Sequence, residues 1–525
     1  MTDSPDDIDG KLDDLERQAT SSYLGGADEA TEALWIRAHN ECLRIGDLPR
    51  AARCVSWLVL DLFNRREWSR GNGWLERGIH LLEPVGDCAE LGLLLVLAAR
   101  NHLRQGDVDA AAAAAERAGE LASRFNDPEL HVFSRLARAL VHARRGQPRE
   151  AASLFDEIMV GVTVDPVSPI AVGVVYCAVI EACRSLFDFS RAREWTAALD
   201  RWCATQPQMV AFRGKCLVHR CEILRNSGAW SEALVEAERA CDWSGAHENS
   251  FRYPSGAAFY ELAEIHRLRG DVAEATEAYR QASEHGQVPE PGLTLLQFAQ
   301  GKRDVAAAAI RRLLSEQQSS LTRADVLLAA VEVLIAVDDP ATARDAANEL
   351  SQLSERFPAP AVRAFAAHAT GAVCLVEGDL PAALHELREA WTVWQELELP
   401  YQAARVRVLL GQACRLSGDH VAAEFEFEAA RQFFQRVAAQ PDVARVDALR
   451  QASQKANTPV LSARERQVIE LVATGKTNRE IARRLSISER TVDRHVSNIL
   501  LKLNLPTRSA ATAYAYQHDL IGRTG

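Results

Sequence analysis

The sequence predicts an all-α protein, in which a long α-solenoid of paired helices is followed by a small four-helix domain. Three observations support this prediction. Alternating hydrophobic and polar residues, the pattern of a half-buried strand, are almost absent. A short phrase built around Gly and Ala recurs along residues 30–450. After residue 460 the phrase stops, and closely spaced helix-capping residues begin.

Composition limits the class of protein. The chain has 525 residues, of which 47% are hydrophobic and 25% charged, values typical of a globular protein large enough for more than one structural unit. Residues 1–29 are acidic and lack an apolar core, so we expect a disordered segment and no signal peptide. No apolar run is long enough to cross a membrane. The eleven cysteines lack a Cys-x-x-Cys pair and are expected to be reduced and buried, which favours a cytoplasmic protein.

The recurring phrase describes a helix hairpin. Examples are "RQGDVDAAA" at residues 104–112 and "VEGDLPAAL" at residues 376–384. Gly is expected to end one helix in the left-handed conformation, and Asp or Pro to begin the next. An Ala five residues after the Gly lets the two helices approach closely. The anchor positions are 66, 106, 146, 187, 228, 270, 301, 338, 378 and 418, mostly 40 to 42 residues apart, which is typical of a solenoid.

The Gly-Asp-x-x-x-Ala phrase resembles tetratricopeptide-type repeats over residues 30–450. The period of that family is about 34 residues, shorter than the spacing in this chain. The resemblance implies a superhelix with a concave groove, which would take a peptide, a protein or a small-molecule effector. We interpret the tryptophans of the array as packing residues rather than as a ligand cage.

A change in the sequence pattern indicates a separate C-terminal domain. The polar segment "QASQKANTPV", residues 451–460, is predicted to be a linker, and residues 461–525 a four-helix domain. In a capping box, a Ser or Thr and a Glu three residues later satisfy each other's backbone N–H groups. Such boxes occur at Ser462 with Glu465 and at Thr477 with Glu480, and predict where the first two helices begin.

The third predicted helix begins at Ser488, and the fourth covers residues 508–518 with Thr507 as its cap. The turn "SIS" joins the second helix to the third. Two short helices joined in this way form a helix-turn-helix, whose second helix can enter the major groove of DNA. The apolar stripe that anchors the third helix consists of Val492, Val496, Ile499, Leu500 and Leu503.

The letters Gly-Lys-Thr at residues 475–477 raise the alternative of a nucleotide phosphate loop. Such a loop needs a second Gly five positions before Gly475, where this chain has Glu470. We therefore interpret Gly475 as a helix end and Thr477 as the cap of the next helix.

Residues 461–521 resemble the LuxR-type DNA-binding domain almost from end to end. The matching pieces are "LSARERQVIELVATG", "TNREIARRLSIS", "ERTVDRHVSNILLKL", "RSAAT" and "HDLI". A helical repeat region before such a domain also resembles the large LuxR-type regulators, which usually carry an N-terminal ATPase module. This chain has no phosphate loop, so we expect neither ATP switching nor any other cofactor.

The resemblance assigns DNA contacts to the third predicted helix and its surroundings. Base edges are assigned to Asp493, Arg494 and Ser497, above all Arg494, because Arg can donate two hydrogen bonds to guanine O6 and N7. LuxR-type domains usually bind inverted repeats as dimers through the last helix, which here carries Tyr514 and Tyr516. Phosphate contacts and positioning are assigned to Lys476, Thr477, Asn478, Ser488, Arg490, Thr491, His495 and Lys502.

Some of these residues have two interpretations. Asp493 could accept a hydrogen bond from cytosine N4, or it could hold Arg490 or Arg494 through a pair on the helix face. We favour the pair, because phosphates repel a free carboxylate. His495 could be a packed side chain, and Arg483 and Arg484 could be a solvated face rather than phosphate contacts.

The charge is distributed unevenly. From residue 461 onward there are eleven Lys and Arg and six Asp and Glu, which gives a charge of +5. The whole chain has a net charge of −12, so the preceding 460 residues carry −17. A basic tail on an acidic body predicts that only the tail meets DNA. The acidic body could also mask the tail in the resting state.

We therefore predict a sequence-specific transcriptional regulator that binds double-stranded DNA as a homodimer, with RNA polymerase as a further candidate partner. The alternative is a repeat-based adaptor whose terminal bundle binds protein instead of DNA. No nucleophile–base pair and no metal-ligand spacing occur in the sequence, so we expect neither an enzyme nor a metal site.

Overall fold

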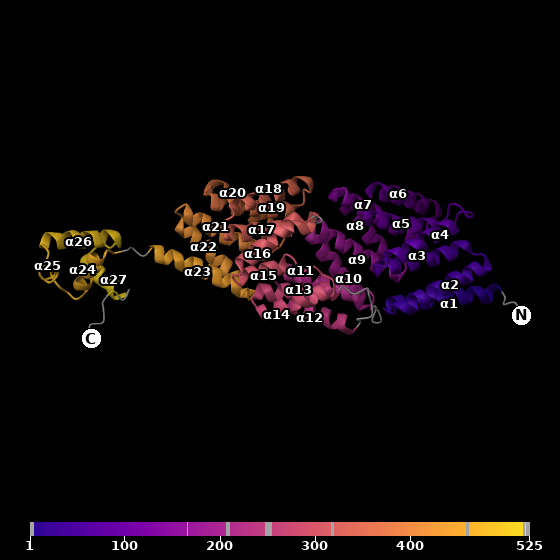
Figure 1. The fold of residues 1–525 in the computed structure, drawn as a ribbon, viewed down its shortest axis with the longest axis horizontal. Coiled ribbons are helices and arrows are strands. Elements are labelled where there is room, and N and C mark those ends of the chain that lie inside the picture. The colour runs from indigo at the N-terminus through magenta and orange to yellow at the C-terminus, as the bar shows by residue number, and fades with distance from the viewer. Residues whose placement is uncertain are drawn as a thin grey trace. The chain divides into compact units, whose positions relative to one another are not determined.

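The computed structural model describes residues 5–164, 166–205, 210–246, 255–316, 320–457, 461–517 and 520 (Figure 1). In these residues all regular structure is α-helical, as predicted. The chain divides into two compact units, Met1–Ala444 and Arg445–Gly525. In the described part of the chain, no helix combines the length and apolar character that a membrane span requires.

The first unit is an α-solenoid, in which each helix packs mainly against its neighbours in the chain. Its first half consists of α1 (Pro5–Leu24), α2 (Asp28–Ile45), α3 (Leu48–Asn64), α4 (Trp68–Leu81), α5 (Ala89–Gln105), α6 (Val108–Phe125), α7 (Pro128–Arg144), α8 (Pro148–Val164), α9 (Pro169–Ser185), α10 (Phe189–Ala204), α11 (Arg213–Asn226) and α12 (Trp230–Ala246). Its second half consists of α13 (Ser255–Arg269), α14 (Val272–Glu284), α15 (Gly292–Ala299), α16 (Arg303–Ser315), α17 (Ser320–Ala336), α18 (Pro340–Arg356), α19 (Pro360–Glu377), α20 (Leu380–Glu396), α21 (Pro400–Leu416), α22 (His420–Arg436) and the start of α23 (Gln440–Asn457).

The joints between helices lie where the sequence predicts them. All ten anchor positions adopt the left-handed backbone conformation, for example Gly106 with φ of 87°. Arg66, Phe187 and Asp338 adopt it without being glycine, at a cost of about 1 kcal/mol each. Asp107 then caps the following helix, accepting the N–H of residue 110 at 3.0 Å.

Close helix packing follows each joint. The Ala five residues after the anchor is fully buried, with 0% exposure at Ala111, Ala233 and Ala383. After the anchor at 66 this position is Gly71, where a Cβ atom would lie 2.5 Å from the ring of Phe63. Larger side chains at these positions would push the two helices of a hairpin apart.

Hairpins that are distant in the sequence also touch within the first unit. The rings of Phe187 and Phe365 lie 5.7 Å apart, and those of Trp230 and Tyr401 lie 5.2 Å apart. The hydroxyl of Tyr401 donates a hydrogen bond of 2.9 Å to Asp442. One turn of the superhelix therefore contacts the next.

The prediction of disorder for residues 1–29 is wrong over the part that the structure describes. Helix α1 packs on α2 through an apolar stripe in which Leu12 is 1% and Tyr23 2% exposed. Its acidic face is paired with Arg50 of α3, which donates to Glu16 at 2.7 Å. These acidic residues therefore dock the helix, and residues 1–4 lie outside the described part.

The predicted linker is also shorter than expected. Helix α23 continues to Asn457, so most of residues 451–460 is helical, and residues 458–460 lie outside the described part. A polar sequence without an apolar stripe can extend a helix that is packed at its other end, because only the packed end must bury side chains.

Cysteine and tryptophan mainly fill the interior of the solenoid, as predicted. All eleven cysteines are free thiols, and nine of them are buried. Burial raises the pKa of Cys177 and of Cys183 to about 12, which keeps both thiols protonated and unreactive. Trp230 and Trp394 are among the largest fully buried side chains.

Candidate nucleic-acid interface

Both predicted capping boxes are present in the second unit. Ser462 accepts the N–H of Glu465 at 3.2 Å, and Glu465 accepts the N–H of Ser462 at 2.7 Å. The same reciprocal pair joins Thr477 to Glu480. These caps begin α24 (Ala463–Ala473) and α25 (Asn478–Leu485); α26 (Glu489–Lys502) and α27 (Arg508–Gln517) complete the predicted four helices.

One small core fixes the orientation of α26. Val492 and Ile499 of this helix are at most 1% exposed and pack with Val468 of α24 and Ile481 of α25. Ser486 ends α25 in the left-handed conformation, and Ser488 caps α26 by accepting the N–H of Thr491 at 3.1 Å. The helix-turn-helix predicted from the sequence is therefore formed, and one face of its second helix is anchored.

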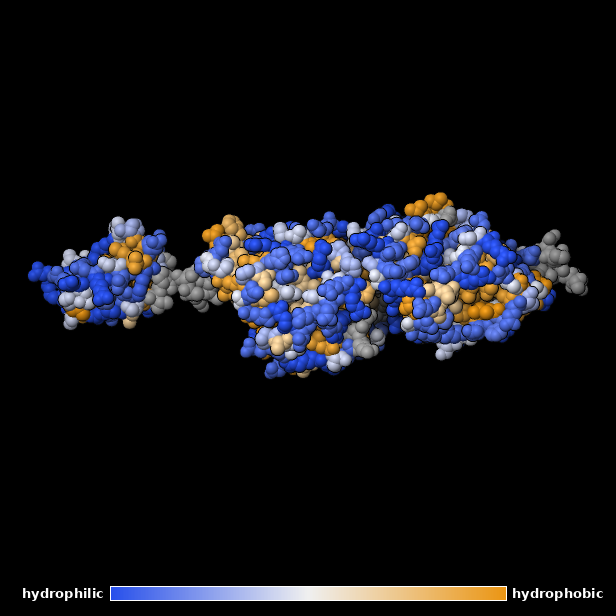
Figure 2. All heavy atoms as spheres, turned by 90° about the horizontal axis from the view of Figure 1, so that it is seen from above, coloured by the Kyte–Doolittle hydropathy of each residue, from blue (hydrophilic) through white to orange (hydrophobic). Residues whose placement is uncertain are grey.

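The opposite face of α26 is exposed. It carries Arg490, Asp493, Arg494 and Ser497 together with Leu501, whose side chain is 83% exposed. The visible surface of the second unit is largely hydrophilic, with small hydrophobic areas (Figure 2). A rigid helix with a polar outer face of this kind can present hydrogen-bonding side chains to a groove.

Asp493 has a different partner from the one we favoured. Its Oδ1 accepts a hydrogen bond from the amide of Asn478 at the start of α25. In the described part of the domain it forms no ion pair with Arg490 or Arg494. A neighbour on α25 is close enough to reach Asp493 because the short turn brings the two helices together.

Arg508 extends this network, and we did not predict a role for it. Its guanidinium donates to Asn478 Oδ1 at 2.6 Å and to the carbonyl of Lys476 at 2.6 Å. Burial lowers the pKa of Arg508, and the Asp493 carboxylate opposes this shift. Asn478 thus links α25, α26 and α27, and the sequence signal for Arg508 was only its place at the start of the last helix.

Lys502 also has a partner inside the domain. Its ammonium donates to Glu465 Oε2 at 2.6 Å, and the Glu465 side chain is only 4% exposed. The hydrogen bond from Lys502 holds the pKa of Glu465 below its usual value. The structure therefore gives Lys502 a partner in the capping box of α24, and the phosphate contact we assigned to it stays a prediction.

The other assigned residues lie around the start of α25 and α26. The hydroxyl of Thr477 donates to Glu480 at 2.9 Å, and the hydroxyls of Ser488 and Thr491 lie 2.7 Å apart. Lys476 and His495 are half-buried. Several of these hydroxyls therefore already have partners within the domain.

The two tyrosines assigned to dimerisation differ in exposure. Tyr514 is half-buried and packs against the core of the domain. Tyr516 is 64% exposed. Of the two, only Tyr516 presents most of its side chain for contact with a second copy.

A family model described as "Bacterial regulatory proteins, luxR family" matches residues 459–515. The C-terminal domain is a LuxR-type helix-turn-helix domain. The match begins within two residues of the predicted start at 461 and ends ten residues before the predicted end at 525, and it covers the capping boxes, α24 to α26 and most of α27.

The curated relatives share the LuxR-type domain. "Uncharacterized transcriptional regulatory protein YhcZ" of Bacillus subtilis (strain 168) is 47% identical over 62 residues, which are 12% of this chain and 29% of that protein. "Response regulator protein VraR" of Staphylococcus aureus (strain NCTC 8325 / PS 47) is also 47% identical over 62 residues, 30% of its length. This chain thus spans less than a third of the length of these relatives.

A solved structure resembles a larger part of the chain. "Crystal structure of APC/C hetero-tetramer Cut9-Hcn1" covers 83% of this chain and 96% of its own, with 12% sequence identity and a TM-score of 0.37. In the described residues, no three His, Cys, Asp or Glu side chains are grouped so as to hold a metal ion.

Proposed function

We propose that this chain regulates transcription by binding specific DNA sequences through its LuxR-type domain. The proposal rests on the difference between the buried face and the exposed face of α26. Val492 and Ile499 lock one face into the core, whereas Arg490, Arg494 and Ser497 stand exposed on the other. A recognition helix needs this combination, because base-edge contacts require side chains held at fixed positions in the major groove.

Base readout is assigned to Arg494, Asp493 and Ser497. Arg494 would donate two hydrogen bonds to a guanine, a contact worth about 1–3 kcal/mol of discrimination between bases. Asn478 holds Oδ1 of Asp493, and the second carboxylate oxygen would accept from the amino group of a cytosine. The nearby guanidinium of Arg508 reduces the repulsion between this carboxylate and the DNA backbone.

Phosphate contacts are assigned to the rim of this face. Arg490 and His495 lie on α26, and the N-terminus of α25 directs backbone N–H groups outward beside Lys476 and Thr477. Ser488 and Thr491 would add hydroxyl contacts, whereas Asn478 positions Asp493. The balance of +5 after residue 460 supports an anionic partner for this unit.

We further propose that two copies bind an inverted repeat, with Tyr516 at the contact between them. One domain reads few base pairs, so two half-sites about one helical turn apart would supply the affinity. The solenoid would control this step through an effector, and its charge of −17 over the first 460 residues would mask the basic domain at rest.

The test is selection of bound DNA from a random pool, followed by Arg494→Ala. We expect the variant to lose roughly 5- to 150-fold of its preference for the selected site over other DNA. The matched control is Arg466→Ala, which removes an exposed arginine from α24 and should leave that preference intact. Equal site preference in the wild-type chain and in Arg494→Ala would contradict the proposal.

A salt titration separates this proposal from the adaptor alternative. Contacts to several phosphates require the affinity for DNA to fall steeply as salt rises. Weak DNA retention with little salt or sequence dependence would favour the adaptor.

Masking by the solenoid predicts that deleting residues 1–444 raises the affinity for the selected site.

A further inference from the structure

A cavity of about 820 Å³ lies inside the first unit. Helices α3, α5, α7 and α9 form most of its wall, and residues of α18 and α19 from the following superhelical turn close it. Its lining is mainly apolar and includes the aromatic side chains of Trp57, Trp68, Phe133 and Phe212. The volume is within the range of about 300–1,000 Å³ that small-molecule sites occupy.

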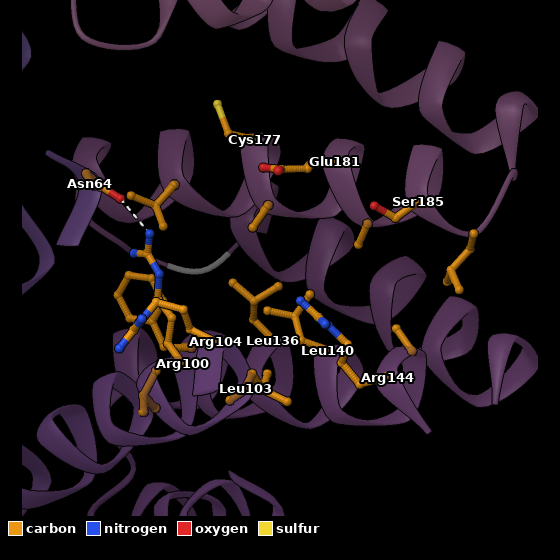
Figure 3. Close-up of a pocket in the computed structure, with 18 of the residues that line it drawn as sticks. Asn64, Arg100, Leu103, Arg104, Leu136, Leu140, Arg144, Cys177, Glu181 and Ser185 are labelled. Carbon is orange, nitrogen blue, oxygen red and sulfur yellow. Dashed lines mark hydrogen bonds between the residues drawn. The ribbon is translucent and has the colours of Figure 1, made fainter. Parts of the chain in front are cut away.

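Cationic side chains line this apolar space. Arg100 is half-buried, whereas Arg104 and Arg144 are exposed. Arg100 and Arg104 project from α5 and Arg144 from α7, across from Glu181 on α9 (Figure 3). Lys215 of α11 also lines the cavity. Four cations against one carboxylate give a formal balance of +3, in a solenoid that is otherwise strongly acidic.

None of these four cations forms an ion pair within the described part of the chain. Arg100 donates one hydrogen bond of 3.0 Å to Asn64, and the guanidinium of Arg104 lies 4.6 Å from the ring centre of Trp68. Other arginines of the solenoid do have carboxylate partners, as Arg191 has in Asp156 at 2.9 Å. Among the described residues that line the cavity, Glu181 supplies the one carboxylate.

Among the three arginines the cost of burial concerns Arg100, because an unpaired cation in apolar surroundings is destabilising unless an anion compensates for its lost hydration. Burial lowers the pKa of Arg100, which agrees with such missing compensation. A carboxylate suits the site, because a guanidinium can bind both of its oxygens at once. The aromatic and aliphatic wall requires the rest of the ligand to be apolar.

We propose that this cavity binds a small amphipathic carboxylate, with its head group on Arg100, Arg104 and Arg144 and its apolar body against the tryptophan-lined wall. Binding itself does not depend on the DNA-binding function; only the role of this ligand as an effector rests on that function. The ligand would bridge two turns of the solenoid, since α5 and α7 hold its head and α18 and α19 close the cavity around it.

The test is calorimetric titration of the full-length chain, without DNA, with decanoate, decanol and decyltrimethylammonium. We expect decanoate to bind at least about tenfold more tightly than decanol, and the cationic probe not to bind. Arg144→Gln should weaken decanoate binding about tenfold and leave decanol binding unchanged. Arg138→Gln, which replaces an exposed arginine of α7 outside the cavity, should change neither.

Equal affinity for decanoate and decanol would overturn the proposal, as would the failure of decanoate to bind the folded chain. An acidic peptide that binds where decanoate does not would assign the cavity to a protein partner, which also contradicts it. Arg144 is exposed at the edge of the cavity, so its replacement tests the head-group contact even if Arg100→Gln fails to fold. Because the titration contains no DNA, failure of decanoate to bind would leave the DNA-binding proposal unaffected. Failure of the chain to bind DNA would likewise leave the proposed carboxylate site unaffected.

Discussion

Replacing Lys502 by Met separates a structural role from a DNA contact. The variant removes the cation that neutralises Glu465, whose side chain is 4% exposed, while Lys502 itself is 42% exposed. Exposed ion pairs contribute below about 1 kcal/mol, and loss of one partner of a buried pair costs about 3–5 kcal/mol. We therefore expect a loss of about 1–2 kcal/mol in the free energy of unfolding of the LuxR-type domain, which corresponds to a decrease in Tm of roughly 5–15 °C for a domain of this size.

The decrease in Tm is measured by circular dichroism on residues 445–525, which form a compact unit of their own. DNA binding by the full chain is measured at several salt concentrations. We expect Lys502→Met to keep the salt slope of wild type. Arg490→Gln removes an assigned phosphate contact and should reduce the magnitude of the slope by about 0.9 for each bound copy. A reduced slope together with an unchanged Tm in Lys502→Met would refute the structural role.

Three further predictions concern the packing of the solenoid and the polar network of the LuxR-type domain. Ala111→Leu should destabilise the solenoid by about 1–3 kcal/mol, because Ala111 is fully buried. Ala113→Leu, on the exposed side of the same helix, should not destabilise it. Urea unfolding of the two variants measures the difference. The pKa of Glu465 is lower in the folded domain than its unfolded value of about 4.3. Its contribution to the free energy of unfolding is therefore present above that pH and is lost as the pH falls through the folded pKa. Lys502→Met should flatten this acid dependence of the urea midpoint, and an unchanged curve would show that Glu465 is not coupled to Lys502. Arg508→Met removes two hydrogen bonds of 2.6 Å and should lower the free energy of unfolding of the LuxR-type domain by about 1–3 kcal/mol. Amide hydrogen exchange at the start of α25 should become faster. Unchanged exchange would show that Arg508 does not position this helix.

Local signals made the joints of the solenoid and the caps of the LuxR-type domain predictable. A left-handed residue followed by an acidic cap and a buried Ala depends on neighbours in the chain, so even the degenerate joint at Phe187 could be placed. The capping box at Ser462 is likewise contained within four residues. The regular spacing of these joints was enough to predict the solenoid.

The misses involve contacts between residues far apart in the sequence. Lys502 at the end of α26 and Glu465 in α24 are separated by helix α25, and no local pattern connects them. Helix α1 looked like a solvated acidic tail, because its partner Arg50 lies two helices later. The cavity was missed for the same reason, since Arg100 and Arg144 line one cavity only when α5 and α7 pack side by side.

The contacts between successive superhelical turns determine how the solenoid responds to force. An open repeat array stretches or twists through many small rotations between neighbours, as a spring does. In this solenoid such rotations would pull Phe187 away from Phe365 and Trp230 away from Tyr401, so elastic deformation is resisted across the coils as well as along them. The first unit should therefore be stiff, and torque applied at one coil should reach the next directly, without passing through every hairpin in between.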